Sequence, residues 1–279
     1  MKPSSWVSIS ILGTGSAIRS SIFLLVIPVV IGSSASAFFI TTVNAFMNTP
    51  QGFTLAGRTI TNIQPLTAMF NPATPSKVAH VLSSAYMTSA FVLASIAAYS
   101  LLKNRTHVYY RKALRFTMVS ALVFSVTTAF VGDLSGKFLA VYQPEKLAAA
   151  EWHFETVEKA PLLIGGVLTH DNEVKFAIKI PFALSILAHG NPAAEVKGLD
   201  QIAKENTPPL FIHYLFDAMV GIGILLSLVS LMFVVSSTLR RWNPYNRILL
   251  RLIVASGPLA LLAIEFGWIF ARWAVSRGF

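Results

Sequence analysis

The chain has 279 residues, of which 54% are hydrophobic and only 12% are charged. Soluble globular domains carry about 25% charged residues, so this composition indicates a protein whose main solvent is lipid. The lack of cysteine excludes disulfides and thiolate chemistry. The net charge of +10 comes from basic residues between apolar runs, which favours contact with anionic membrane lipid and argues against a nucleic-acid partner.

Five apolar segments are long enough to be membrane-spanning helices, because a spanning helix needs about 20 mostly apolar residues. The first contains Pro28 and a run of Gly, Ser and Ala over 32–37 that suits close helix packing. We therefore predict an all-α integral membrane protein of about five transmembrane helices. The predicted helices cover residues 20–47, 78–102, 113–131, 210–238 and 248–275.

The charged residues between these helices predict the topology. The connections 103–115 and 239–251 contain several Lys and Arg but no acid, so the positive-inside rule places both on the cytoplasmic side. The connections 48–77 and 133–209 then lie outside the cell. All twelve acidic residues follow residue 132, and ten of them fall in the second outer connection.

The outer connection between the third and fourth helices is too long for a simple linker, since structureless connections beyond about 15 residues are uncommon. It contains patterned apolar stretches, of which 146–151 has a helical pattern. We predict that this connection is an ordered cap over the membrane surface. The chain then divides into three transmembrane helices over 1–132, an outer loop over 133–209 and two further helices over 210–279.

Few polar side chains lie at membrane depth, where ionisable groups are costly and tend to be functional. The topology puts His80, near the outer end of the second helix, at about the depth of Met219 in the fourth. A His and a Met on facing helices can be the axial pair of a low-spin heme, although each alone is more often a packing residue. His213 and Asp217 share a helix face as a metal pair, a proton relay or, more simply, a hydrogen-bonded pair. Glu265 is a proton-path carboxylate or the partner of an arginine.

A longer pattern points to a family. The sequence GDLSG at 132–136 is followed by QPEKLAAAE at 143–151 and ET at 155–156. This order resembles the start of the quinol-binding loop of cytochrome bd oxidase subunit I, whose pattern is GDxxG, then QPxKxAAxE, then ET. Further segments that resemble the family in the same order are 43–50, 71–80, 175–181, 216–221 and 265–268.

The resemblance implies roles for particular residues. His80 and Met219 would be the axial ligands of a low-spin heme b. Lys146 would hydrogen-bond the quinol, and Glu151 would accept its proton at the outer surface. The other site residues that the resemblance implies are Asp133 for the catalytic site, and Glu265 and Trp268 for contacts with the cofactor.

The chain also departs from the family pattern. Asp217 stands where the family's FRxMVG segment has its arginine, and Arg272 stands where the family has the glutamate ligand of its high-spin heme b. The family's GRQPW segment is replaced by RGF at 277–279, and its first three or four helices do not precede this sequence. Because an arginine cannot act as an axial carboxylate, we do not expect this chain to hold high-spin heme b or heme d.

The resemblance therefore implies quinol oxidation with electron transfer to a low-spin heme b, within a cytochrome bd-type respiratory oxidase in the plasma membrane of a prokaryote. The expected partners are quinol, membrane lipid, a subunit II-like chain and another subunit I-like chain. The oxygen site would then lie on another chain, or the electron acceptor is not oxygen. Two alternatives are open at this point: a heme-free structural or assembly subunit, and an inactive fragment of a full-length oxidase subunit.

Overall fold

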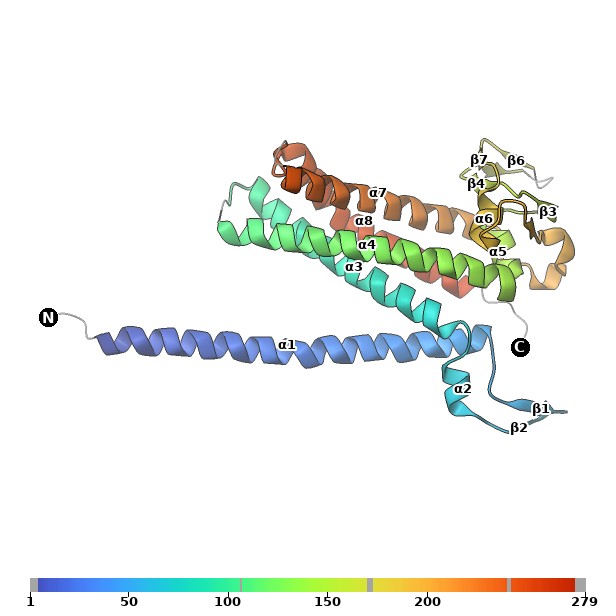
Figure 1. Cartoon of the computed structure of the whole chain (residues 1–279), viewed down its shortest axis with the longest axis horizontal. Coiled ribbons are helices and arrows are strands. Elements are labelled where there is room, and N and C mark those ends of the chain that lie inside the picture. Colours follow the sequence, from blue (N-terminus) through green and yellow to red (C-terminus); the bar gives the residue numbers. More distant parts are fainter. Residues whose placement is uncertain (1–4, 106, 170–172, 240–241, 274–279) are drawn as a thin grey trace.

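The computed structural model describes residues 5–105, 107–169, 173–239 and 242–273, and it is mostly helical (Figure 1). Five helices are long and apolar enough to cross a membrane, which confirms the predicted all-α membrane fold. The predicted residues 274–275 of the last helix lie outside the described residues. The five helices are α1 (Ser5–Asn48), α3 (Thr74–Leu102), α4 (Val108–Tyr142), α7 (Ile212–Leu239) and α8 (Arg247–Trp273).

Four of these helices form a bundle. Helix α3 packs against α4 and α8, and α7 packs against the same two helices. It follows that α3 and α7 lie diagonally across the bundle, and so do α4 and α8. The interior is filled by apolar side chains that are almost fully buried, among them Phe91, Leu114, Met118, Phe233 and Ile253.

Helix α1 lies beside the bundle. It contacts α3 and the short helix α2 (Pro65–Met69), and it diverges from the bundle toward its N-terminal end (Figure 1). Its described side chains are mostly apolar and exposed; Leu24 and Val29, for example, are 66% and 68% exposed. Such a surface suits lipid, which satisfies apolar side chains but no polar group. A hairpin of β1 (Thr54–Ala56) and β2 (Thr59–Thr61) joins α1 to α2.

Residues 143–211, here called the cap, cover one end of the bundle (Figure 1). The described residues of the cap, 143–169 and 173–211, form short elements. Its strands pair in three antiparallel sets, β3 with β8, β4 with β7 and β5 with β6. The elements are α5 (Pro144–Ala150), β3 (Val157–Glu158), β4 (Leu162–Ile164), β5 (Val167–Leu168), β6 (Val174–Lys175), β7 (Ile178–Ile180), α6 (Ala183–His189), β8 (Glu195–Val196), η1 (Leu199–Gln201) and η2 (Lys204–Asn206).

The predicted end of the third helix at residue 131 is wrong. Helix α4 continues through Asp133 to Tyr142, so the cap begins ten residues later than expected. The physical reason is that nothing in 132–142 breaks a helix: Asp133 pairs with Lys137 one turn later, and Gly136 gives the room that Leu187 of α6 needs. The first helix-breaking residue is Pro144, at the start of α5.

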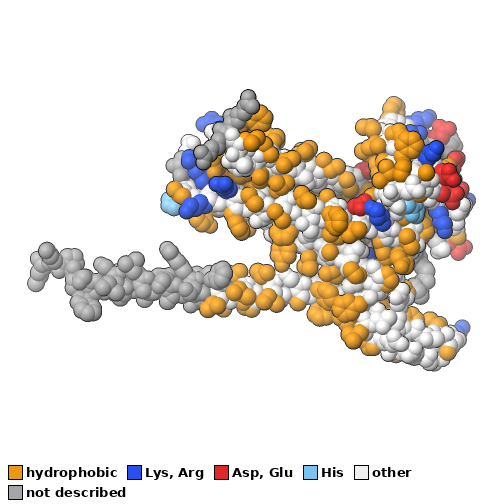
Figure 2. Space-filling model, viewed as in Figure 1, with side chains coloured by type: hydrophobic (Ala, Val, Ile, Leu, Met, Phe, Trp, Pro, Cys, Tyr) orange, Lys and Arg blue, Asp and Glu red, His pale blue; other side chains and the backbone are white. Residues whose placement is uncertain are grey.

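The two ends of the bundle differ in charge. Figure 2 shows Lys and Arg at the end away from the cap, and acidic side chains together with Lys or Arg at the cap. This is the separation that the topology prediction used, with basic connections on one side and the acidic connection on the other.

Candidate functional site

Two short helices of the cap, α5 and α6, pack against the bundle, and α5 contacts both α4 and α7. Helix α5 begins with Pro144 at its first position, where the missing N–H costs nothing. Five consecutive residues, 146–150, are buried, although the helix contains a lysine and is followed by a glutamate. The helix predicted over 146–151 is thereby confirmed, but its charged residues are inside the protein.

Lys146 is only 5% exposed. Its ammonium group donates to the side-chain oxygen of Asn48 on α1, at 2.7 Å, and to that of Gln143, at 2.9 Å. Burial, and to a smaller extent the nearby charge of Lys77, lower the pKa of Lys146 to about 7 against an opposing effect of Glu145. Lys146 is therefore held in place by neutral amides and exchanges its proton close to neutral pH.

Glu151, the residue that caps the end of α5, is 1% exposed. Neither of its carboxyl oxygens has a hydrogen-bond partner within the described part of the chain. Burial raises the pKa of Glu151 to about 8, and the negative charge of Asp217 contributes to the same effect. A buried carboxyl without a partner is costly, which makes it a candidate for contact with a polar ligand.

The two residues face different helices. Lys146 contacts α1 through Asn48, whereas Glu151 lies within electrostatic reach of Asp217 on α7. In the residues that the structure describes they form no ion pair with each other. Helix α5 and its C-terminal cap residue thus place Lys146 on the side of α1 and Glu151 on the side of α7, and both groups exchange protons near neutral pH.

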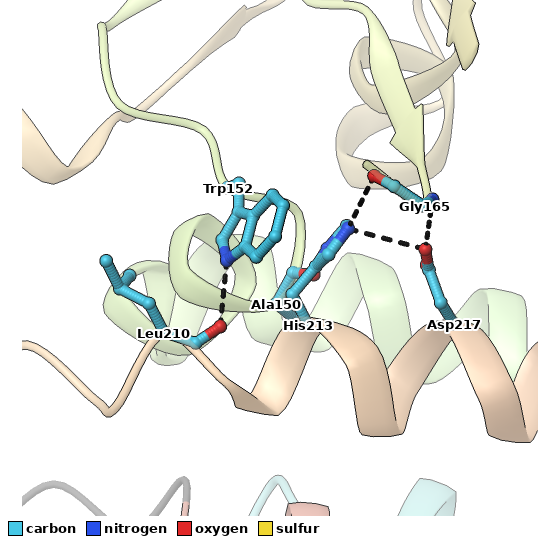
Figure 3. A network of polar contacts seen from close by, with 6 residues as sticks. All are labelled: Ala150, Trp152, Gly165, Leu210, His213 and Asp217. Atoms are coloured by element: carbon cyan, nitrogen blue, oxygen red, sulfur yellow. Dashed lines mark hydrogen bonds and ion pairs between the residues drawn. The ribbon is translucent and has the colours of Figure 1, made fainter. Parts of the chain in front are cut away.

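A polar network ties Ala150, Trp152 and Gly165 of the cap to His213 and Asp217 of α7 (Figure 3). His213, which is fully buried, approaches the carbonyl oxygens of Ala150 at 2.6 Å and of Gly165 at 3.3 Å, and the carboxylate of Asp217 at 3.3 Å. The amide of Gly165 also donates to Asp217. The side chains of His213 and Asp217 therefore meet, as their shared helix face predicted, through a 3.3 Å contact between the imidazole and the carboxylate.

Trp152 completes this network. Its ring stacks on that of His213 with centroids 4.0 Å apart, and its indole N–H donates to the carbonyl of Leu210 at 2.8 Å. The residues on both sides of Glu151 are therefore fixed to α7, one through a carbonyl and the other through a ring.

His80 and Met219 lie below the cap on the diagonal helices α3 and α7. His80 comes six residues after the start of α3 and Met219 seven residues after the start of α7, so both are about 10 Å from the helix end at 1.5 Å per residue. Nδ1 of His80 is buried and has no hydrogen-bond partner among the described residues. A Cβ at Gly132 would lie 3.8 Å from the His80 ring, and one at Gly267 would lie 3.0 Å from the Met219 sulfur.

Comparison with known proteins decides the family. Residues 3–275 match the family model described as cytochrome bd terminal oxidase subunit I. The chain belongs to this family.

The relatives agree in sequence and in structure. The bd oxidase from Geobacillus thermodenitrificans contains a chain that is 60% identical, with a TM-score of 0.86 over 92% of this chain and 59% of that one. The Bacillus subtilis protein named "Putative cytochrome bd menaquinol oxidase subunit I" is 46% identical over 87% of this chain and 56% of its own length. A second B. subtilis relative, named cytochrome bd ubiquinol oxidase subunit 1, is 27% identical over 86% of this chain and 54% of its own length. The chain thus spans a little more than half the length of these relatives.

The remaining residues that the cytochrome bd resemblance implied lie elsewhere. Asp133 forms its ion pair with Lys137 on the surface of α4, with 45% of its side chain exposed. Glu265, Trp268 and Arg272 are all exposed on α8. Their spacing of three and four residues puts them on one outward stripe, whereas the neighbouring Gly267 faces Met219 inside the bundle.

Sequence reasoning gave no role to several residues that the structure brings to the site. Asn48 and Gln143 hold the ammonium group of Lys146, and Asn44 accepts a hydrogen bond from Lys77 at 3.4 Å. All of these residues lie in segments that resembled the cytochrome bd pattern, at 43–50, 71–80 and 143–151. Their position in those segments was the available signal, because the contacts of Asn44 and Asn48 join residues far apart in the chain.

Proposed function

We propose that this chain oxidises quinol beneath the cap and passes the electrons to a low-spin heme b held by His80 and Met219, as the quinol-oxidising part of a cytochrome bd-type oxidase. One observation carries the proposal. The buried Lys146 and Glu151 lie on one short helix over the bundle end in which His80 and Met219 occupy diagonal helices. A heme-free structural or assembly subunit has little reason to bury two such groups, because burial costs each of them its hydration.

The residues present fit the heme. Imidazole nitrogen and thioether sulfur are an axial pair that proteins use for electron-transfer hemes. His80 has a buried ring nitrogen without a partner, and glycines stand beside both His80 and Met219 where a larger side chain would take the space. When bound, the heme supplies one-electron chemistry; the chain supplies the two ligands and the polar groups above them.

The protein groups of the cap perform the acid–base part of the reaction. Lys146, fixed by Asn48 and Gln143, donates a hydrogen bond to a quinol oxygen. Glu151, in its ionised form, accepts a proton from the quinol, and its pKa of about 8 is close to the pH at which general bases work best. The buried position of both groups keeps bulk water away from the quinol oxygens.

The topology predicts on which side of the membrane the protons are released and in which direction the electrons move. With the cap on the outer face of the plasma membrane, protons from the quinol are released outside, while electrons move inward. A subunit II-like chain and a second subunit I-like chain would complete the oxidase and supply the oxygen-reducing site. The named relatives include one menaquinol and one ubiquinol oxidase, so the proposal is made for quinols as a class.

A reduced-minus-oxidised visible spectrum tests the proposal directly. The purified full chain is expected to give a low-spin heme b signal. His80→Ala and Met219→Ala should each abolish this signal or convert it to high spin, while Lys137→Ala, a change in a surface ion pair, should leave it intact. A well-folded protein that carries no heme together with its native partners would refute the proposal and leave a structural subunit or an inactive fragment.

A further inference from the structure

Two lysines meet at the junction of α1, α3 and the cap. Lys146 comes from α5 and is buried, and Lys77 comes from the first turn of α3 and is half-buried. The charge of Lys77 acts on Lys146, so the two ammonium groups are electrostatic neighbours. In the described part of the chain neither lysine forms an ion pair.

Two asparagines on successive turns of α1 connect these lysines. Lys77 donates to the side-chain oxygen of Asn44 at 3.4 Å, and Lys146 donates to that of Asn48 at 2.7 Å. The amide of Asn48 in turn donates to the carbonyl oxygen of Asn44 at 2.7 Å. Every oxygen that meets an ammonium group here is a neutral amide, which orients the cation but does not balance its charge.

Three physical costs coincide at this junction. The cations are out of water, they repel each other, and Lys77 sits in the first turn of a helix, where the helix dipole disfavours positive charge. An anion between the two ammonium groups would relieve all three. Buried cations without carboxylate partners are typical of sites that receive a negatively charged ligand group.

We propose that Lys77 and Lys146 form a two-cation site for one negatively charged oxygen, with Asn44 and Asn48 of α1 as its positioning residues. The inference rests on the proposed function, which offers two sources of such an oxygen. One is the ionised hydroxyl of the quinol, and the other is a propionate of the heme. Lys77 and the end of α1 are thereby added to the site, next to Lys146.

A pair of quinone analogues tests the site without turnover. The probes are a hydroxynaphthoquinone, whose hydroxyl is a vinylogous acid that is ionised at neutral pH, and its methyl ether, which is neutral. Binding of each to the full chain in lipid nanodiscs is followed by quenching of tryptophan fluorescence. We expect the anionic probe to bind at least about tenfold more tightly than the ether, because a charge-assisted hydrogen bond is worth that much.

Variants of Lys77 show whether this lysine causes the preference for the anionic probe. Lys77→Gln should remove the preference, and Lys77→Arg should keep it. Lys103→Gln removes a lysine at the opposite end of the same helix and should change nothing. If the oxygen is instead a heme propionate, Lys77→Gln should leave the preference unchanged and shift the midpoint potential of the heme downward, which a redox titration measures.

The outcomes separate this inference from the proposed function. If Lys77→Gln alters neither the preference for the anionic probe nor the heme potential, in a protein that binds both probes and heme, the two-cation site is refuted while quinol oxidation stands. A protein that binds neither naphthoquinone nor heme would refute both.

Discussion

The hydroxyl of Ser95 on α3 donates a hydrogen bond of 2.8 Å to the backbone carbonyl of Val254 on α8. That carbonyl is the one that Pro258, four residues later, leaves without an intrahelical donor. Lipid offers no replacement, so the partner must come from another helix. Gly257 allows this contact, since a Cβ there would lie 2.8 Å from the Cβ of Ser95.

Two variants separate the hydrogen bond from the close approach. Ser95→Ala removes the donor and should lower the stability of the bundle by about 1 kcal/mol, the usual worth of an interhelical hydrogen bond in a membrane. Gly257→Ala should cost more, because it forces α3 and α8 apart. Thermal unfolding in detergent, followed by circular dichroism, measures both. A Gly257→Ala protein as stable as the parent would show that the two helices are not closely packed at this point.

The pKa of Glu151 predicts how stability depends on pH. Burial raises the pKa of Glu151 from its ordinary value of 4.5 to about 8, so between these values the folded state holds a proton that an unfolded chain with an ordinary glutamate has lost. Raising the pH through this window therefore destabilises the fold. Glu151→Gln has no such proton, so relative to the parent it should gain roughly 1.4 kcal/mol per pH unit between pH 5 and 8. Melting curves of both proteins at several pH values test this, and parallel profiles would contradict it.

The same residue predicts the pH dependence of activity under the proposed function. Quinol oxidation should rise with pH toward a plateau above about 8, because only the ionised form of Glu151 accepts a proton. Glu151→Gln should lower the rate by about a hundredfold and remove this pH step, since general bases typically contribute 10²-fold or more. Glu151→Asp should retain part of both effects. The measurement is a pH profile of steady-state rates with a soluble quinol, and an unchanged profile in Glu151→Gln would show that another group takes the proton.

The link between the cap and α7 predicts a local effect of Asp217. Asp217→Ala leaves the amide of Gly165 without its acceptor and removes the contact between Asp217 and His213, so the cap should open more often. We expect trypsin to cut at the exposed Lys175 about ten times faster, with little change in the helical bundle. Asp217→Asn keeps an acceptor oxygen and should be intermediate. Asp133→Asn, in an exposed ion pair, is the matched control, and equal cleavage in all four proteins would mean that other contacts hold the cap.

The sequence predicted most of the fold because transmembrane helices are specified by composition. Each of the five predicted segments overlaps one of the five long helices over most of its length, and the errors are at the ends: α7 begins at Ile212, two residues later than predicted, and α4 runs on past Asp133 to Tyr142. The hydropathy of the sequence falls at Asp133, but the helix continues to Tyr142, because an amphipathic helix can leave the membrane and continue in water.

The site was predicted only in part. The resemblance to cytochrome bd subunit I named Lys146 and Glu151, yet composition alone would make both ordinary solvated charges. Their burial depends on contacts with Asn48 and the vicinity of Asp217, which lie 98 and 66 residues away in the chain. Such contacts follow from how α1 and α7 pack against α5, and no local pattern encodes them.

The outward stripe of Glu265, Trp268 and Arg272 has a consequence for how the protein is maintained in the cell. A carboxylate that faces hydrocarbon is costly, and Glu265 lies eight residues inside the end of α8, whereas Arg272 lies next to that end and can reach the interface. This side of α8 is therefore expected to have a cover over Glu265. Newly inserted chains without that cover would be recognised as orphans and degraded. The steady-state amount of the protein should then follow the supply of whatever covers α8, and overproduction of this chain alone should yield little.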